Sequence, residues 1–467
     1  MSATIEQDRV LNLDQAKRLM QEKIKEVYAS FVLTARSMDE PAVVRFEIAI
    51  DDVPPLSWLA AQKNRVKTYW SDRQGKFEMA GIGAADVVSG KGEIDHDLLF
   101  TCLNKLLVGG NESLRYYGGL RFSEKNESLH DTPWEDYGSY RFVMPRFELF
   151  HQSDTTYLAC NVVLGIDRPG ADAVLDELGD IVSLIESSDT ELPGIMARSD
   201  CPDMERWNAM VEAALESINI NKLEKLVLAK QTSFELSMLL NPIRLLQRLK
   251  QATPGCYHFG LQLSDNLAFV GAPPEQLYQR INRTIRSEAV GGTRPRGATV
   301  DKDEALAQEL LRSEKDLREY RYVADSLQET LGCLCQSAES VDDLSLLKLA
   351  TVQHLITHFK GKLAPGISDA DILAAMHPTP AVGGYPVDRA VRKIDELEPF
   401  DRGWYTGPVG WIGYDAAEFA VAIRSGLVAG DKLHLFAGAG IVKGSTAESE
   451  WMEIENKLNS FTKVFIA

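Results

Sequence analysis

The residues best suited to chemistry lie near the C-terminus, between Ala437 and Lys457. Glu450, Glu453 and Lys457 recur at spacings of three and four, which would place two carboxylates and an ammonium on one face of a helix. Such a face could hold a cation or an anionic ligand. The alternative is a solvated face on which Glu453 and Lys457 form an ion pair worth roughly 0.2–0.5 kcal/mol.

The segment before this helix is rich in glycine. Gly438 and Gly440 alternate within an apolar run, which predicts a strand with one bare edge that a ligand could approach closely. Ser445, followed three residues later by Glu448, predicts a capping box and therefore the start of the helix.

A second acidic face occurs earlier in the chain. The spacing of apolar residues predicts a long amphipathic helix from Asp301 to Leu331, and within it Asp316 and Glu319 are three residues apart. Two helices that each offer paired carboxylates suit a hard cation such as Mg2+, which prefers oxygen ligands and retains water. Paired acids at helical spacing also arise by chance, so the alternative is again a solvated surface.

Two further residues could act as a base and an acid. Lys225 opens a predicted strand, and burial there would lower its pKa towards a useful range for a base, whereas exposure would make it a solubility device. Glu275 follows Pro273 and Pro274, which keep it out of a regular element and fix its direction. The alternative for Glu275 is an exposed turn residue.

Bulk composition excludes several classes of partner. The chain has 467 residues and a formal net charge of -18, so neither nucleic acid nor an anionic membrane surface is expected to bind it. Its six cysteines are scattered without a CxxC pair, which indicates a reducing compartment and no thiolate zinc site. The charged N-terminal segment and the lack of a long apolar run predict a cytoplasmic protein.

Mixed helix and strand patterns predict an α+β class for the first half of the chain. Residues 13–33 have helical spacing, and residues 42–50 and 157–166 are rich in strand formers. A polar tract from Glu186 to Asp203 predicts a boundary, which divides the chain into an N-terminal half, 1–195, and a second half, 196–467. The second half is predicted to contain a helix at 204–218, a strand at 222–229 and paired strands at 256–263 and 267–271.

A series of motifs in the second half resembles the chorismate-utilising enzymes, which include isochorismate, salicylate, anthranilate and aminodeoxychorismate synthases. In order, the motifs are KLVLAK, GAPPEQL, VGGTRPRG, SEKDLREYRYV, VQHL, HPTPAVGGYP, YTGPVGW, VAIR and GAGIVKGSTAESEWMEIENK. The resemblance covers roughly residues 223–458. It implies an α/β (α+β) fold of two packed halves, with large, mainly antiparallel sheets, outer helices and an active site in the cleft between the halves.

The resemblance also implies an activity and the residues that perform it. The chain is most similar to members that convert chorismate to isochorismate with Mg2+, particularly those that serve menaquinone biosynthesis. Lys225 matches the lysine that activates the water attacking C2, and Glu275 matches the glutamate that protonates the departing C4 hydroxyl. Glu319 and Glu453 match the metal ligands, and Asp316 and Glu450 would support the metal through water.

The other matched residues would bind the two carboxylates and the ring of chorismate. Lys457, together with the backbone near Gly438 and Gly440, would contact one carboxylate, and Arg424 with Tyr405 would contact the enolpyruvyl carboxylate. A satisfied core histidine and a strand arginine paired with an acid are the alternatives for His354 and Arg424. The matched substrate-binding set is Thr293, His354, Ala381, Tyr405, Arg424, Gly438, Gly440 and Lys457.

Particular positions distinguish members of the family. Gly291 and Gly292 precede Thr293, where ammonia-incorporating members carry a nucleophilic lysine, so no glutamine amidotransferase subunit is expected. Ala381 stands where salicylate synthases tend to carry threonine, which favours release of isochorismate. The alternatives are a salicylate synthase, a siderophore-pathway isochorismate synthase, or a catalytically silent chorismate-binding subunit. Departures from the family pattern occur at Tyr320, Lys230 and Pro273.

Overall fold

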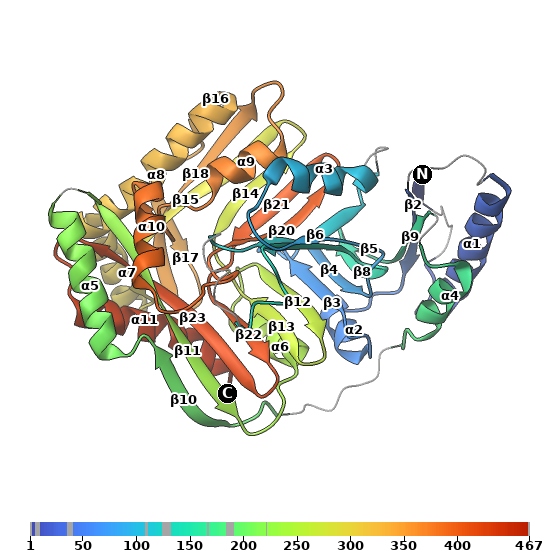
Figure 1. Cartoon of the computed structure of the whole chain (residues 1–467), viewed down its shortest axis with the longest axis horizontal. Helices are drawn as coiled ribbons and strands as arrows, with labels where there is room; N and C mark the ends of the chain where they lie inside the picture. The colour runs from blue at the N-terminus through green and yellow to red at the C-terminus, as the bar shows by residue number, and fades with distance from the viewer. Residues whose placement is uncertain are drawn as a thin grey trace.

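The chain folds around two large β-sheets. The computed structural model describes residues 2–4, 10–34, 41–107, 111–123, 132–165, 168–183, 191–220 and 222–465. Within these residues, the strands form one sheet of 13 strands and another of 10. Neighbouring described strands are antiparallel apart from the short parallel pair β1 and β2, and helices lie outside the sheets (Figure 1). The predicted fold class is therefore confirmed.

The two sheets have the following strands, given in spatial order. The first runs β1 (Ser2–Thr4), β2 (Ala42–Ile50), β9 (Thr155–Leu164), β8 (Phe147–Gln152), β4 (Phe77–Ile82), β3 (Lys67–Ser71), β12 (His258–Ser264), β13 (Leu267–Gly271), β22 (Ser425–Ala429), β23 (Lys432–Val442), β11 (Lys225–Leu236) and β10 (Ile195–Cys201), with β19 (Gly384–Tyr385) beside β11. The second runs β16 (Cys335–Ser340), β18 (Val352–Leu363), β15 (Thr284–Pro295), β14 (Gln276–Ile281), β21 (Ala416–Val421), β20 (Pro408–Gly413), β6 (Arg115–Leu120), β7 (Tyr140–Met144) and β5 (Asp86–Gly90), with β17 (Ser345–Lys348) beside β18.

The helices pack against these sheets from several sides. Figure 1 shows α1 and α4 at the end of the molecule that holds β2 and β9, and α5, α7 and α11 towards the opposite end. Their bounds are α1 (Leu13–Thr34), α2 (Pro55–Ala61), α3 (His96–Leu107), α4 (Ala171–Gly179), α5 (Met204–Asn219), α6 (Pro242–Ala252), α7 (Val300–Arg312), α8 (Glu314–Leu334), α9 (Asp369–Met376), α10 (Val387–Leu397), α11 (Ala447–Thr462) and the 3-10 turn η3 (Lys463–Phe465).

Amphipathic spacing explains how a helix such as α5 attaches to the sheet. Asp203 caps its N-terminus by accepting a hydrogen bond from the Arg206 amide. The helix then buries one face, which includes Trp207, Met210 and Ile218, at the spacing expected of a surface helix. Among the described helices, none is long and apolar enough to cross a membrane.

Both sheets contain strands from the two predicted halves of the chain. β3 pairs with β12 in the first sheet, and β6 pairs with β20 in the second. Within the tract predicted as a boundary, residues 186–190 lie outside the described residues, whereas Ile195–Cys201 forms β10 and pairs with β11. The division at residue 195 stays a prediction, and the backbone pairing closely joins the two halves.

Most elements predicted from the sequence are present at the expected places. The helices at 13–33 and 204–218 and the strands at 42–50, 157–166 and 267–271 correspond to α1, α5, β2, β9 and β13, and residue 166 lies outside the described residues. The long helix predicted from Asp301 to Leu331 is wrong in one respect, because it is broken into α7 and α8 at Ser313. The extended backbone of Ser313 ends α7, and its hydroxyl then accepts from the Asp316 amide to begin α8.

The start of α11 also differs from the prediction. The cap is Thr446, whose hydroxyl accepts a hydrogen bond from the Ser449 amide, and not Ser445. Ser445 instead accepts from the amide of Val442 at 3.1 Å and closes the turn between β23 and α11. Because its hydroxyl is used in that turn, the predicted Ser445–Glu448 capping box does not form.

Candidate active site

A cavity of about 320 Å³ lies where the two sheets and two helices meet. Strands β11 and β23 come from the first sheet, β15 and β18 from the second, and α8 and α11 complete the wall. Except for Glu450, every residue matched to a family role contributes to this lining: Lys225, Glu275, Thr293, Asp316, Glu319, His354, Ala381, Tyr405, Arg424, Gly438, Gly440, Glu453 and Lys457. Residues separated by more than 200 positions therefore face one space.

Lys225 is the first residue of β11. The strand pairs antiparallel with β23, so Lys225 lies opposite Val442, and its side chain is buried with 5% exposure. Burial lowers the pKa of its ammonium, and the nearby charge of Glu319 opposes this shift. Of the two interpretations of Lys225 drawn from the sequence, the structure favours a buried base over an exposed solubility device.

The bare edge of β23 gives Lys225 and Glu319 the room that they occupy. A Cβ atom at Gly440 would lie 3.0 Å from Cε of Lys225 and 3.3 Å from Oε2 of Glu319. A Cβ atom at Gly438 would lie 3.4 Å from Oη of Tyr405. These glycines therefore let cavity side chains approach the strand, a role that the sequence pattern had suggested only for a ligand.

Glu275 lies in the segment between β13 and β14, as its neighbouring prolines predicted. Its carbonyl oxygen accepts from the Val421 amide at 3.2 Å, and its side chain is buried with 6% exposure. Burial, together with the negative charge of Glu288, raises the pKa of Glu275 to about 8. The carboxyl group is therefore mainly protonated at neutral pH and can donate a proton.

Helix α8 approaches the cavity over two glycines of β15. A Cβ atom at Gly291 would lie 3.0 Å from Cα of Tyr320, and one at Gly292 would lie 3.0 Å from Cβ of Asp316. Gly292 also has a φ of +59°, a conformation that side chains disfavour. This close packing brings the acidic face of α8 to the cavity, and Asp316 is held there by Arg294 at 2.9 Å.

Lys315 links the two acidic helices, a connection that the sequence analysis missed. Its Nζ atom lies 3.2 Å from Oε1 of Glu450 and 3.9 Å from Oε1 of Glu319. Glu450 thus lies outside the cavity lining, buried behind Lys315 with 2% exposure. Lys315 follows Glu314 at the start of α8, and only the tertiary packing of α8 against α11 identifies its partner.

Glu319 and Glu453 are two carboxylates of the cavity lining whose charges interact. Burial raises the pKa of Glu319, and the charge of Glu453 adds to this rise, so the two groups repel one another. Glu453 is held by Lys457 at 2.6 Å, which confirms the predicted i, i+4 pair and lowers the pKa of Glu453. In the described part of the chain, no three His, Cys, Asp or Glu residues are grouped to hold a metal.

This donor set fits a cation that keeps much of its hydration. Mg2+ commonly binds one or two protein carboxylates and completes its shell with water and substrate oxygens. Two mutually repelling carboxylates beside one cavity suit that arrangement, whereas a site with protein ligands alone would need a larger group. The residues present therefore fit Mg2+, and Lys457, which also donates to the Gly438 carbonyl at 2.9 Å, supplies a second positive charge.

His354 and Thr293 form a polar pair in the cavity lining. The Nδ1 atom of His354 lies 3.0 Å from the carbonyl oxygen of Gly292 and 3.1 Å from Oγ1 of Thr293, which assigns the proton to Nδ1. Burial lowers the pKa of His354 to about 3, so the ring is neutral. Its Nε2 atom is buried and has no hydrogen-bond partner in the described structure.

The remaining wall combines a cation with aromatic rings. Arg424 has a φ of +49°, which is unusual for a residue with a side chain and occurs often at functional sites. Tyr405 stacks on Phe436 with ring centroids 5.4 Å apart. Together with Ala381, these residues offer a guanidinium fork beside an apolar surface, which suits a planar carboxylate attached to a ring.

The three departures from the family pattern lie outside the cavity lining. Tyr320 donates to Oγ1 of Thr357 at 2.6 Å, and Lys230 is buried, pairs with Glu455 and lies 3.6 Å from the ring centroid of Trp451. The carbonyl oxygen of Pro273 accepts from the Tyr257 amide at 2.8 Å. Each departure therefore has a partner of its own away from the cavity.

Comparisons with known proteins agree on one family. The family described as chorismate binding enzyme matches residues 29–466. The isochorismate synthase MenF of Haemophilus influenzae is 32% identical over 426 residues, covering 91% of this chain and 92% of that protein. The salicylate biosynthesis isochorismate synthase of Pseudomonas aeruginosa is 29% identical over 93% of this chain and 92% of that protein.

The fold matches a solved structure over almost its whole length. The menaquinone-specific isochorismate synthase MenF of Escherichia coli superposes with a TM-score of 0.81 at 26% identity. The match covers 95% of this chain and 100% of that structure.

Proposed function

Because the chain belongs to the family of chorismate-binding enzymes, we propose that it is an isochorismate synthase that converts chorismate to isochorismate. The observation that carries this proposal is the pairing of two oppositely perturbed groups at one cavity. Burial lowers the pKa of Lys225, and burial with Glu288 raises that of Glu275. An enzyme that uses a base and an acid in the same step needs groups tuned in these opposite directions.

The proposed reaction exchanges one hydroxyl group for another across the diene of the ring. Neutral Lys225 takes a proton from a water molecule as its oxygen bonds to C2. The double bonds shift, the bond between C4 and its hydroxyl breaks, and Glu275 supplies the proton with which that hydroxyl leaves as water. One water enters and one leaves, so the product is an isomer of the substrate.

The other cavity residues would orient the substrate. Arg424 and Tyr405 are proposed to bind the enolpyruvyl carboxylate, since a guanidinium fork matches a planar carboxylate. Lys457 would bind the second carboxylate. Small Ala381 leaves no hydroxyl beside the substrate, which supports isochorismate and not salicylate as the released product.

Mg2+ is the proposed cofactor, held by Glu319 and Glu453. When bound there, it would neutralise the substrate carboxylate that Lys457 also faces and so reduce charge repulsion within an acidic cavity. Asp316 would support the site through water, and Glu450 would act indirectly through Lys315.

We propose the menaquinone pathway as the destination of the product. The support is similarity to proteins named MenF, whereas the similarity to a salicylate-biosynthesis protein keeps the siderophore-type alternative open. All of these proteins bear the name isochorismate synthase, so the reaction is supported more strongly than the pathway.

Analysis of the reaction products tests this function. Purified protein is incubated with chorismate and Mg2+, and the products are separated by chromatography. We expect isochorismate in equilibrium with chorismate. Salicylate with pyruvate would identify a salicylate synthase, ammonia-dependent anthranilate a different member of the family, and saturable binding without any product a silent subunit.

Replacing a proposed metal ligand tests the cofactor. Glu453→Gln removes one negative charge from the cavity at nearly constant shape, so we expect the Mg2+ concentration for half-maximal activity to rise at least ~10-fold. Direct Mg2+ binding, measured by calorimetry, should weaken in parallel. Glu448→Gln on the same helix, at an exposed position outside the cavity lining, is the control. Full wild-type activity in the presence of a chelator would disprove the site.

A further inference from the structure

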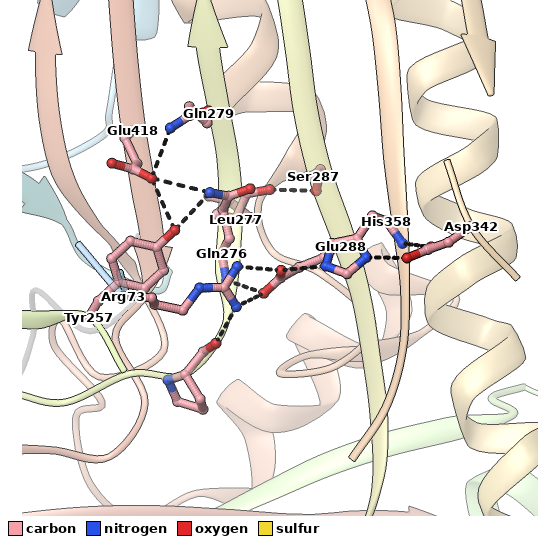
Figure 2. A network of polar contacts seen from close by, with 11 residues as sticks. Arg73, Tyr257, Gln276, Leu277, Gln279, Ser287, Glu288, Asp342, His358 and Glu418 are labelled. Atoms are coloured by element: carbon pink, nitrogen blue, oxygen red, sulfur yellow. Dashed lines mark hydrogen bonds and ion pairs between the residues drawn. The ribbon is translucent and has the colours of Figure 1, made fainter. Parts of the chain in front are cut away.

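The peptide units on both sides of Glu275 are held by the same pair of charged side chains. Nη1 of Arg73 donates to the carbonyl oxygen of Pro274 at 3.0 Å, and the amide of Gln276 donates to Oε1 of Glu288 at 2.8 Å. Arg73 and Glu288 in turn form a bidentate ion pair with distances of 2.8 and 2.7 Å. Figure 2 shows this pair beside Gln276. We refer to Arg73 and Glu288 as the acid clamp.

The acid clamp connects the two halves of the chain. Arg73 comes from the turn between β3 and β4, and Glu288 lies within β15. The guanidinium also lies 5.2 Å from the ring centroid of Tyr257, whose hydroxyl donates to Glu418 at 3.0 Å (Figure 2). Because the carboxylate of Glu288 is almost fully buried, its position depends on these contacts.

We propose that Arg73 and Glu288 are positioning residues for the acid Glu275, so that the N-terminal half of the chain takes part in the reaction through Arg73. This proposal rests on the proposed function, because it assumes that Glu275 donates a proton. The reason is geometric. Two prolines limit the backbone before Glu275, and the clamp fixes the flanking carbonyl and amide, so the direction in which the side chain leaves the backbone is set.

Electrostatics supports the same assignment. The charged groups that act on Glu275 are Glu288 from β15, Lys225 from β11, Arg73 from the β3–β4 turn and Lys457 from α11. Glu288 raises the pKa of Glu275, whereas the three cations lower it. The clamp thus keeps the negative charge of Glu288 close to Glu275, and Arg73 pairs with Glu288 to stabilise that charge.

A third residue reaches the clamp from the protein surface. His358 on β18 has Nε2 at 3.9 Å from Oε2 of Glu288, and its Nδ1 lies 2.6 Å from Asp342. Figure 2 shows this extension from Glu288 through His358 to Asp342. His358 and Asp342 are therefore the side chains that face Glu288 from the surface side.

Three variants separate the positioning role from a purely structural one. Glu288→Gln keeps an acceptor for the Gln276 amide but removes the charge, Arg73→Met removes the fork, and the double variant removes both. We expect kcat to fall ~10- to 100-fold in all three, with KM for chorismate within about 2-fold of wild type. Arg73→Met alone should lower Tm, because it leaves Glu288 buried without its partner, and the double variant should recover Tm but not kcat.

The pKa of Glu275 gives a readout that a structural role would not move. Infrared spectroscopy of the enzyme without substrate measures this pKa, because a protonated carboxyl group has its own absorption band. The band that disappears in Glu275→Gln belongs to Glu275, and its intensity is followed as a function of pH. Glu288→Gln should move this titration to lower pH, and Arg73→Met should move it to higher pH. Both measurements are repeated in a His358→Gln background, so that this neighbour of Glu288 cannot account for the shift.

The bidentate pair of Arg280 and Asp369 is a matched control. Its two contacts are both 2.7 Å, it is similarly buried, and it attaches β14 to α9 outside the cavity lining. Arg280→Met with Asp369→Asn should leave kcat within about 2-fold of wild type.

Two outcomes would overturn the proposal. Recovery of kcat together with Tm in the double clamp variant would make the pair purely structural, as would a loss of kcat in the control pair equal to that in the clamp. If the wild-type protein forms no isochorismate, the proposed function fails instead. The infrared titration still reports on the clamp in that case, so the two failures are distinguishable.

Discussion

Replacement of Lys225 by alanine is expected to lower kcat for isochorismate formation by ~10²- to 10⁴-fold while chorismate still binds. The lysine is the buried amine of the cavity, and alanine leaves its place without any base. Substrate binding should persist because Arg424, Tyr405 and Lys457 are unchanged. Product chromatography measures kcat, and calorimetric titration measures the Kd for chorismate.

Two controls make this result specific. Lys222→Ala changes an exposed lysine three residues earlier and should leave kcat within about 2-fold of wild type. A small primary amine added to Lys225→Ala should restore part of the activity by occupying the space of the lost side chain. A wild-type kcat in Lys225→Ala would refute the assignment of the base.

The same two groups link catalysis to the fold. Lys225 belongs to β11 of the first sheet, and Glu275 to the segment that links β13 of that sheet to β14 of the second, so the base lies on a strand and the acid on the connection between the sheets. Each forward turnover leaves Lys225 protonated and Glu275 ionised, and a proton must return to Glu275 before the next. Burial shifts the pKa values of both Lys225 and Glu275. Exclusion of water around the bound substrate therefore maintains the shifted pKa values that the reaction needs.

Local sequence patterns predicted many helices and strands, and the resemblance to family motifs predicted which residues line the cavity. Strand formers located β2, and periodicity located α5, because both elements bury a regular face. Periodicity could not reveal the break at Ser313, since apolar spacing continues on both sides and only the cap hydrogen bond marks the new helix. The cap at Thr446 was missed for a similar reason, because adjacent hydroxyl residues are equivalent in sequence.

Contacts between residues far apart in the chain could not be predicted from a single sequence. Glu288 lies two residues before the VGGTRPRG motif, and nothing near it in the sequence indicates that its partner is Arg73, more than 200 residues earlier. Lys315 was visible beside Asp316, but its contact with Glu450 depends on how α8 packs against α11. Gly440 leaves space for the side chain of Lys225 because of the register between β23 and β11. In that register, Gly440 lies opposite Val227, two residues beyond Lys225. Such contacts arise from tertiary packing and not from local propensity.

Replacement of Glu275 by glutamine is expected to abolish catalysis and to stabilise the fold at once. Glutamine keeps the shape of the side chain but cannot donate the proton to the leaving hydroxyl, so kcat should fall ~10²- to 10⁴-fold. The folded protein holds the pKa of Glu275 at about 8 against an ordinary value of 4.5. Between these pH values, the folded state binds more protons than the unfolded state, and stability falls as pH rises.

Glu275→Gln does not lose stability in this way as pH rises, because glutamine does not ionise. A shift from 4.5 to about 8 corresponds to at most ~5 kcal/mol, so the stability gain should be absent near pH 4, grow through neutral pH and level off above about pH 8. Urea unfolding of both proteins across this range measures the difference. Glu339→Gln, at an exposed position of β16, is the control and should show no such trend.

Two results would contradict these expectations separately. A difference in unfolding free energy that does not change with pH would show that the pKa of Glu275 is not raised in the folded protein. A wild-type kcat would show that another group supplies the proton. Loss of kcat together with a pH-dependent gain in stability would show that the folded protein retains a buried, costly carboxyl group because the reaction requires its proton.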